Sequence, residues 1–241
     1  MLGRNVGVQR RGKDEAEKPF WISFADLMSA LMVLFLVVMS AALLSVTKTI
    51  TEREIQEKQR VDDINAIVKR FEDAASKFDG IRVDGVGDRR VINFGKRAQF
   101  PFNSASLTDD QQRLLREFVP EILTRANDEL GKKILKRIVV EGFTDKTGKY
   151  LFNLNLSLQR SQRVLCAMFG KPLLGERPLT EDEQAQIRAL FLVGGYSFND
   201  ARDTDEQSRR VEMRLEFLGI GESRPSTTGA VPGNLGTCAL D

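Results

Sequence analysis

The chain has 241 residues, a length that holds one sizeable domain with extensions, and its 36 basic and 34 acidic side chains leave a formal net charge of +2. Its 41% of hydrophobic residues suits a globular domain. The sequence predicts no metal site and no enzyme, because it has no histidine, only two cysteines, and neither a P-loop nor a nucleophile-elbow pattern. The basic residues are spread along the chain rather than clustered, which argues against direct nucleic-acid binding.

An apolar run from Phe20 to Val46 predicts a single transmembrane helix. As a helix it would extend about 40 Å, more than the ~30 Å hydrocarbon core of a bilayer. A cleaved signal peptide is the alternative, but its apolar core would be shorter. Basic residues in the preceding segment, 1–19, predict a cytoplasmic N-terminus by the positive-inside rule. The bulk of the chain would then lie in the periplasm of a Gram-negative bacterium, anchored in the inner membrane.

Asp26 is the one charged residue inside this run. A charged aspartate at the centre of a membrane helix costs about 2.5 to 3.5 kcal/mol on insertion scales, so a function is expected for it. The alternative is that it snorkels to the nearby cytoplasmic surface. It shares a helical face with mostly small or polar residues, which suits close contact with other protein helices. Because a low dielectric favours the neutral carboxyl group, Asp26 is predicted to carry protons, or Na⁺ if neighbouring chains add oxygen ligands.

Residues 47–79 contain neither proline nor glycine and predict a helical stalk. Apolar side chains in its later part recur at helical spacing, at positions 64, 67, 68, 71, 75 and 78. This amphipathic pattern leads us to expect a stalk that associates with a second copy of itself.

Residues 80–218 alternate short β-prone runs with helical ones, which predicts an α+β domain with helices on one face of a mixed sheet. Thr108 is expected to cap the first helix, and Pro120 to kink it. The expected strands are 89–94, 136–142, 189–196 and 209–217, and the expected helices 108–126 and 153–169. An insertion at about 171–188 carries a short helix from Thr180 and has no assignable role. The tail, 219–241, is rich in Gly, Pro, Ser and Thr and is predicted to be flexible.

Both cysteines, Cys166 and Cys238, lie on the outer side of the predicted membrane helix, where an oxidising compartment permits disulfides. We hypothesise that they pair and tie the tail to the domain. Two free thiols remain the alternative, because sequence fixes no connectivity.

A possible binding site follows the strand at 136–142. Asp145 lies just beyond this strand, and Arg160 lies on the next helix. An acid and an arginine placed there suit a ligand that carries both an ammonium and a carboxylate group, although an ordinary surface ion pair is an alternative. Arg160 is expected to point away from the core, because the buried face of the helix is assigned to Leu154, Leu158, Leu165 and Met168.

Several motifs support a family resemblance. "GFTDKTG", "NLNLSLQRSQRV" and "SRRVEMRLEF" closely resemble OmpA-like peptidoglycan-binding domains, and "PFWISFADLM" resembles the membrane segment of flagellar stator B subunits. Within this superfamily the chain most resembles the stator-like B subunit of the Zorya anti-phage defence system, over nearly its whole length. The basis includes "DEAEKPFWISFADLM", "LMVLFLVVMS" and "IRALFLVGGYSFN".

The resemblance implies that two copies of the chain sit within a ring of multi-span A subunits. Flow of H⁺ or Na⁺ past Asp26 would rotate the ring without further cofactors, the outer domain would hold peptidoglycan, and the motor would act on cytoplasmic effectors that attack phage DNA. A flagellar stator subunit and a passive wall tether without ion transport are the alternatives.

Matched motif by motif, the resemblance implies peptidoglycan-binding residues, with Asp145 taking the ammonium of diaminopimelate and Arg160 a carboxylate. The full set is Asp145, Phe152, Asn153, Leu156, Arg160 and Arg210. The chain departs from the pattern at Phe143, where the family usually has histidine, and at Ser208, where asparagine is common.

Overall fold

The computed structural model describes residues 17–225 and 238. The predictions for the cytoplasmic segment up to residue 16, and for the tail at 226–237 and 239–241, therefore lie outside the described residues. The chain divides into two compact units, Met1–Gln56 and Glu57–Asp241, which are treated separately below.

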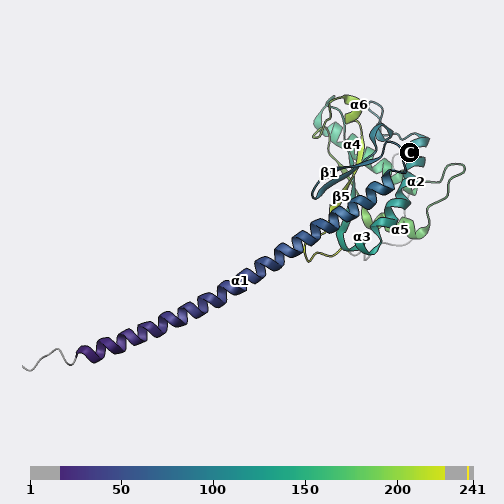
Figure 1. Ribbon diagram of the computed structural model, residues 1–241. Coiled ribbons are helices and arrows are strands. Elements are labelled where there is room, and N and C mark those ends of the chain that lie inside the picture. Colours follow the sequence, from purple (N-terminus) through teal and green to yellow (C-terminus); the bar gives the residue numbers. More distant parts are fainter. Residues whose placement is uncertain (1–16, 226–237, 239–241) are drawn as a thin grey trace, which may run out of the picture. The chain divides into compact units, whose positions relative to one another are not determined.

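The described part of the first unit is helical and belongs to α1, Glu17–Ala75 (Figure 1). Its side chains from residue 21 to residue 50 are all exposed. The hydroxyl groups of Ser29 and Ser40 donate hydrogen bonds to carbonyl oxygens four residues back in the same helix, which leaves these polar groups satisfied in an apolar surrounding. In the described chain, this is the one helix that is long and apolar enough to cross a membrane.

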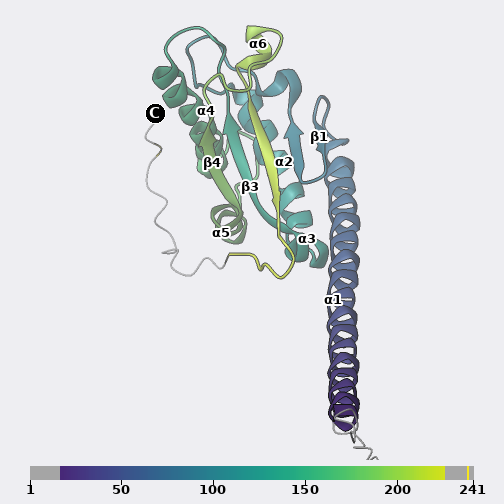
Figure 2. The same cartoon turned by 90° about the vertical axis from the view of Figure 1, so that its left-hand side faces the viewer.

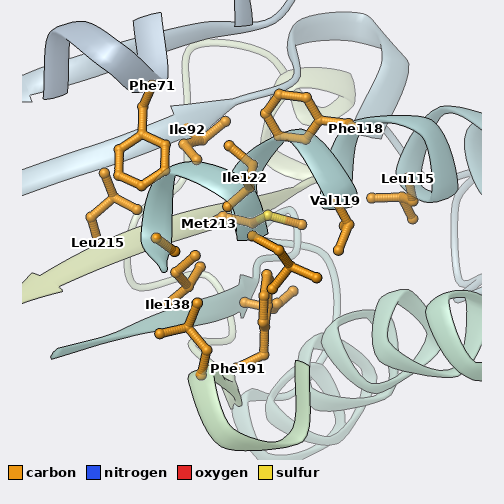
Figure 3. Close-up of a cluster of buried hydrophobic side chains, with 14 of the residues drawn as sticks. Phe71, Ile92, Leu115, Phe118, Val119, Ile122, Ile138, Phe191, Met213 and Leu215 are labelled. Carbon is orange, nitrogen blue, oxygen red and sulfur yellow. The ribbon is translucent and has the colours of Figure 1, made fainter. Parts of the chain in front are cut away.

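The last turns of α1 belong to the second unit, and this differs from the predicted free stalk. The apolar face is buried in the domain core, where Phe71 lies close to Ile92 and Leu215 (Figure 3). Ile64, Ile67 and Phe71 are at most 2% exposed within one chain, so the domain itself covers this face. Association of the stalk with a second copy stays a prediction. The compact unit begins at Glu57 rather than at the predicted residue 80.

A five-stranded mixed sheet forms the centre of the second unit, in the order β1-β2-β5-β3-β4. β3 and β4 are parallel and the other neighbours are antiparallel, as a mixed sheet requires. The strands are β1 (Arg82–Val86), β2 (Arg89–Asn93), β3 (Leu135–Gly142), β4 (Phe191–Gly195) and β5 (Val211–Phe217). All four predicted strands are present, and β1 is an additional edge strand.

The two longer helices of the domain, α2 and α4, lie on the same face of this sheet (Figure 2). Helix α2, Asp109–Ala126, runs through Pro120, and the residue before it, Thr108, forms a capping box with Gln111. Helix α4, Tyr150–Phe169, begins three residues earlier than the predicted start at residue 153. The helices of the domain are α2 (Asp109–Ala126), α3 (Glu129–Ile134), α4 (Tyr150–Phe169), α5 (Glu181–Leu190), α6 (Asp205–Ser208) and the 3-10 turn η1 (Gly95–Ala98).

The core lies between this helical layer and the sheet (Figure 3). Phe118 of α2 is fully buried, and the rings of Phe78 and Phe94 pack edge-on against it at centroid distances of 5.3 and 5.5 Å. Each large apolar side chain buried in this way contributes about 1.5–3 kcal/mol. The core thereby fixes α2 and α4 against β3, and so fixes the end of β3.

The predicted insertion folds back onto α2 through Glu176. Its carboxylate accepts hydrogen bonds from Arg116, at 2.5 Å, and from the backbone amide of Leu173. Thr180 caps α5 in a capping box with Glu183, as the predicted helix start requires.

The disulfide between Cys166 and Cys238 is present, with 5.8 Å between the Cα atoms, which confirms that prediction. A second attachment holds the segment after β5. Arg224 donates hydrogen bonds to the carbonyl oxygens of Ala126, Gly131 and Leu135. The expectation that the chain is flexible from residue 219 onward, apart from the disulfide, is therefore wrong for residues 219–225.

Replacing Cys238 by serine should lower the free energy of unfolding by about 2–4 kcal/mol. The bond has a sequence separation of 72, and a cross-link over a long loop restricts the unfolded chain strongly. Thermal unfolding of the full-length protein in detergent, without reductant, measures the effect. Reductant should lower the midpoint of the wild type and leave Cys238→Ser unchanged. Equal midpoints for the two proteins, or two free thiols in the intact mass of the wild type, would contradict the prediction.

Candidate functional site

A small pocket lies where β3 ends and α4 begins. Gly142, the last residue of β3, is needed because a Cβ atom there would lie 1.9 Å from the carbonyl oxygen of Ser157, so only glycine lets α4 pack this closely. Gly148 has φ of +100° and allows the turn that leads into α4. The pocket is lined by Phe102, Asn103, Thr144, Asp145, Thr147, Phe152, Asn153, Leu156 and Arg160.

Asp145 is 4% exposed and is held from two sides. Its Oδ1 accepts a hydrogen bond from the backbone amide of Thr147 at 2.9 Å, and its Oδ2 accepts one from Arg209 at 3.0 Å. Arg209 also donates to the carboxylate of Glu206. Burial alone would lower the pKa of Arg209, but Asp145 and Glu206 outweigh it and raise this pKa above its ordinary value.

Arg160 is fully buried, so the prediction that it points away from the core is wrong. Its guanidinium donates hydrogen bonds to the carbonyl oxygens of Ser104, Phe143 and Pro101, at 2.9, 2.6 and 3.3 Å. Burial lowers the pKa of Arg160 to about 10, against an opposing effect of Asp145. The group therefore stays charged at neutral pH.

The buried face of α4 is more polar than expected. Ser157 and Ser161 are fully buried, as is Arg160, whereas Leu158 is 42% exposed. Asn153 is also buried, and its side-chain amide donates to the carbonyl oxygen of Thr147 at 2.9 Å. The side of α4 that faces the sheet is thus the side that carries the site.

The structure brings five of the six predicted peptidoglycan-binding residues to this pocket. Arg210 is the exception. Its guanidinium lies 4.2 Å from the ring centre of Phe143 and pairs with Glu212 and Asp200, each at 2.7 Å. Arg209, which the sequence analysis did not single out, is the member of the Arg-Arg pair that contacts Asp145. A binding role for Arg210 stays a prediction.

Thr144 is a second residue that the sequence did not single out. It is 1% exposed and lines the pocket between Phe143 and Asp145. Its Oγ1 has no hydrogen-bond partner among residues 17–225 and 238. A buried polar group left unpaired costs about 1–3 kcal/mol.

The chemistry of the pocket suits the binding of a compact charged group. Asp145 and Arg160 present opposite charges in a buried setting, and each is held by fixed partners. Two phenylalanines, Phe102 and Phe152, are 63% and 54% exposed and supply an apolar rim. Within the described residues, no group of three or more His, Cys, Asp or Glu side chains is placed to hold a metal ion.

The other candidate residue, Asp26, lies on the exposed part of α1 in the first unit. Within residues 21–225, no side chain forms a hydrogen bond or ion pair with its carboxyl group. Steps of three and four residues along the helix place Ser23, Ala30 and Val33 on the same face as Asp26. That face is available to helices of other chains.

An apolar helix with a single acid, followed by an α+β domain with a buried Asp-Arg site, is the arrangement expected of a stator-like B subunit, and the similarities to known proteins support this class. Residues 7–51 match the family model described as membrane MotB of the proton-channel complex MotA/MotB. Over 224 residues the chain is 47% identical to Zorya protein ZorB of Escherichia coli O139:H28 (strain E24377A / ETEC), covering 93% of this chain and 91% of that protein. The chain therefore belongs to the ZorB family, and the predicted resemblance is confirmed.

Two solved structures are similar to parts of this chain. One is a MotB-like protein from Desulfovibrio vulgaris, at 18% identity and a TM-score of 0.47, covering 68% of this chain and 97% of that one. The other is the cell wall anchor of the T6SS from Pseudomonas aeruginosa, at 22% identity and a TM-score of 0.40, covering 62% and 96%. The family assignment rests on the ZorB relative.

Proposed function

We propose that the chain is the membrane-anchored B subunit of an ion-driven rotary motor in anti-phage defence, and that its outer domain anchors the motor to peptidoglycan. The observation that carries the proposal is the 47% identity to ZorB along 93% of the chain, which spans both the membrane helix and the outer domain. A flagellar role is less well supported, because the whole-length relative is a Zorya protein.

The membrane segment supplies the ion pathway in this proposal. Asp26 is the sole acid between Phe20 and Val46, within the residues that match a proton-channel family. It takes up and releases H⁺ or Na⁺ at an interface with multi-span A subunits that surround two copies of this chain. By the positive-inside rule, the basic residues ahead of the helix favour a cytoplasmic N-terminus, and on that side the motor acts on defence effectors.

The pocket supplies the wall anchor. A carboxylate has about four lone-pair positions, and two of those on Asp145 are used by Thr147 and Arg209, so the ammonium of diaminopimelate can still bind. Arg160 has five N–H groups, of which three are used, so two remain for a carboxylate. Because Arg160 is fully buried, side chains at the mouth must shift before a ligand reaches it.

Replacing Asp145 by asparagine tests the anchor. We expect at least tenfold weaker retention of the full-length protein on purified peptidoglycan sacculi, because a charge-assisted hydrogen bond to the ligand ammonium is lost. Co-sedimentation measures retention, and the thermal midpoint checks the fold. Asp203→Asn is the matched control, since Asp203 is an exposed acid of the same domain. Retention of Asp145→Asn at the wild-type level would remove Asp145 from the wall-binding site.

A further inference from the structure

The hydroxyl group of Thr144 is the unexplained polar atom of the pocket. The residue is 1% exposed, and Oγ1 finds no hydrogen-bond partner in the described chain. Its neighbours are satisfied: the amide of Thr144 donates to the carbonyl oxygen of Ser197 at 2.9 Å, and the carbonyl oxygen of Phe143 accepts from Arg160 at 2.6 Å. The backbone that carries the hydroxyl is therefore fixed, and only the side-chain oxygen awaits a partner.

The charges around this hydroxyl favour an anion. Arg160 is a fully buried cation, Arg209 is a second cation whose side chain is 12% exposed, and Asp145 is the buried anion that pairs with Arg209. The side chain of Glu206, the second acid on Arg209, is 68% exposed, so water screens its charge. The buried groups thus carry a net positive charge, and a hydroxyl that donates to a carboxylate there would form a charge-assisted hydrogen bond.

We propose that Thr144 is a further ligand-binding residue, whose hydroxyl donates a hydrogen bond to the same stem-peptide carboxylate that Arg160 binds. This inference rests on the proposed wall-binding function. It assigns the site a chemical preference for a free carboxylate. An amide at that position of the peptide presents no negative charge to Arg160, and it offers Thr144 only one neutral acceptor, its carbonyl oxygen, in place of two charged ones.

The test compares Thr144→Val, which keeps the shape of the side chain but removes the hydroxyl, with Thr144→Ser, which keeps the hydroxyl. The full-length proteins are titrated in detergent with a soluble muropeptide carrying free diaminopimelate, and with the same muropeptide amidated at that carboxylate. We expect Thr144→Val to bind the free form about tenfold more weakly, and Thr144→Ser to stay within about twofold of the wild type. Because no internal hydrogen bond is lost, the thermal midpoint of Thr144→Val should be unchanged or higher.

The outcomes separate this inference from the wall-binding proposal. Wild-type binding with an unchanged affinity in Thr144→Val overturns the role of Thr144 and leaves wall binding intact. A lower thermal midpoint in Thr144→Val with unchanged affinity also overturns it, because the hydroxyl would then serve the fold through a buried water. If Thr144→Val weakens the binding of the free and of the amidated muropeptide equally, the hydroxyl does not donate to that carboxylate and the assignment is contradicted. Failure of the wild type to bind either form removes the proposed wall binding, and this inference with it.

Discussion

Cells that carry the whole defence gene cluster with Asp26→Asn should lose protection against phage completely. Asparagine has nearly the shape of aspartate but takes up no proton at neutral pH, so an ion pathway through this position stops while the helix still packs. Phage plating efficiency at matched expression measures protection. Co-purification of the variant from membranes with its multi-span partner shows whether the complex still assembles.

Two variants serve as controls for this experiment. Asp26→Glu keeps a carboxyl group and should retain part of the protection. Asp62→Asn removes an exposed acid from the same helix and should protect like the wild type. Full protection by Asp26→Asn would show that Asp26 is a tolerated residue at the membrane surface and would favour a passive tether.

Replacing Arg160 by alanine should lower the free energy of unfolding by about 3–5 kcal/mol and abolish wall binding. Three carbonyl oxygens, of Pro101, Ser104 and Phe143, lose their donor at once, and each unpaired buried group costs about 1–3 kcal/mol. Denaturant unfolding of the full-length protein in detergent measures the change, and co-sedimentation with sacculi measures binding.

Arg89→Ala is the matched control for Arg160→Ala, because Arg89 is exposed on β2. Its free energy of unfolding should stay within about 0.5 kcal/mol of the wild type. If Arg160→Ala is as stable as Arg89→Ala, the three carbonyl oxygens have found other donors and the guanidinium is not needed for the fold.

The elements of the domain were largely predictable, because their signals are local. The helix cap at Thr108 and the β-prone run that ends at Gly142 can each be recognised from a few neighbouring residues. The observed bounds of α2 and β3 therefore follow the prediction closely. β1 was missed because Gly85 stands where an alternating strand would place its next apolar side chain after Val83, so the five residues show no sustained alternation. The disulfide was predicted from the compartment alone, and its pairing is confirmed.

The site was predictable by motif but not by helix geometry. Arg160 was placed on the outer face because leucines were taken to mark the core, but its carbonyl partners, at Pro101 and Ser104, lie more than fifty residues away in sequence. Similarly, the apolar face that contains Phe71 was correctly predicted as helical, but periodicity does not tell whether the same chain or another copy covers it.

Under the proposed wall anchoring, the disulfide has a mechanical consequence. Tension applied between the membrane helix and a ligand in the pocket is carried along the chain by residues up to Arg160, because the pocket-lining residues run from Phe102 to Arg160. β5 lies beyond this load-bearing stretch, yet it is the strand that joins β2 to β3. The Cys166–Cys238 bond closes the loop that contains β5, so the strand between β2 and β3 belongs to a covalent ring that the load does not pull open.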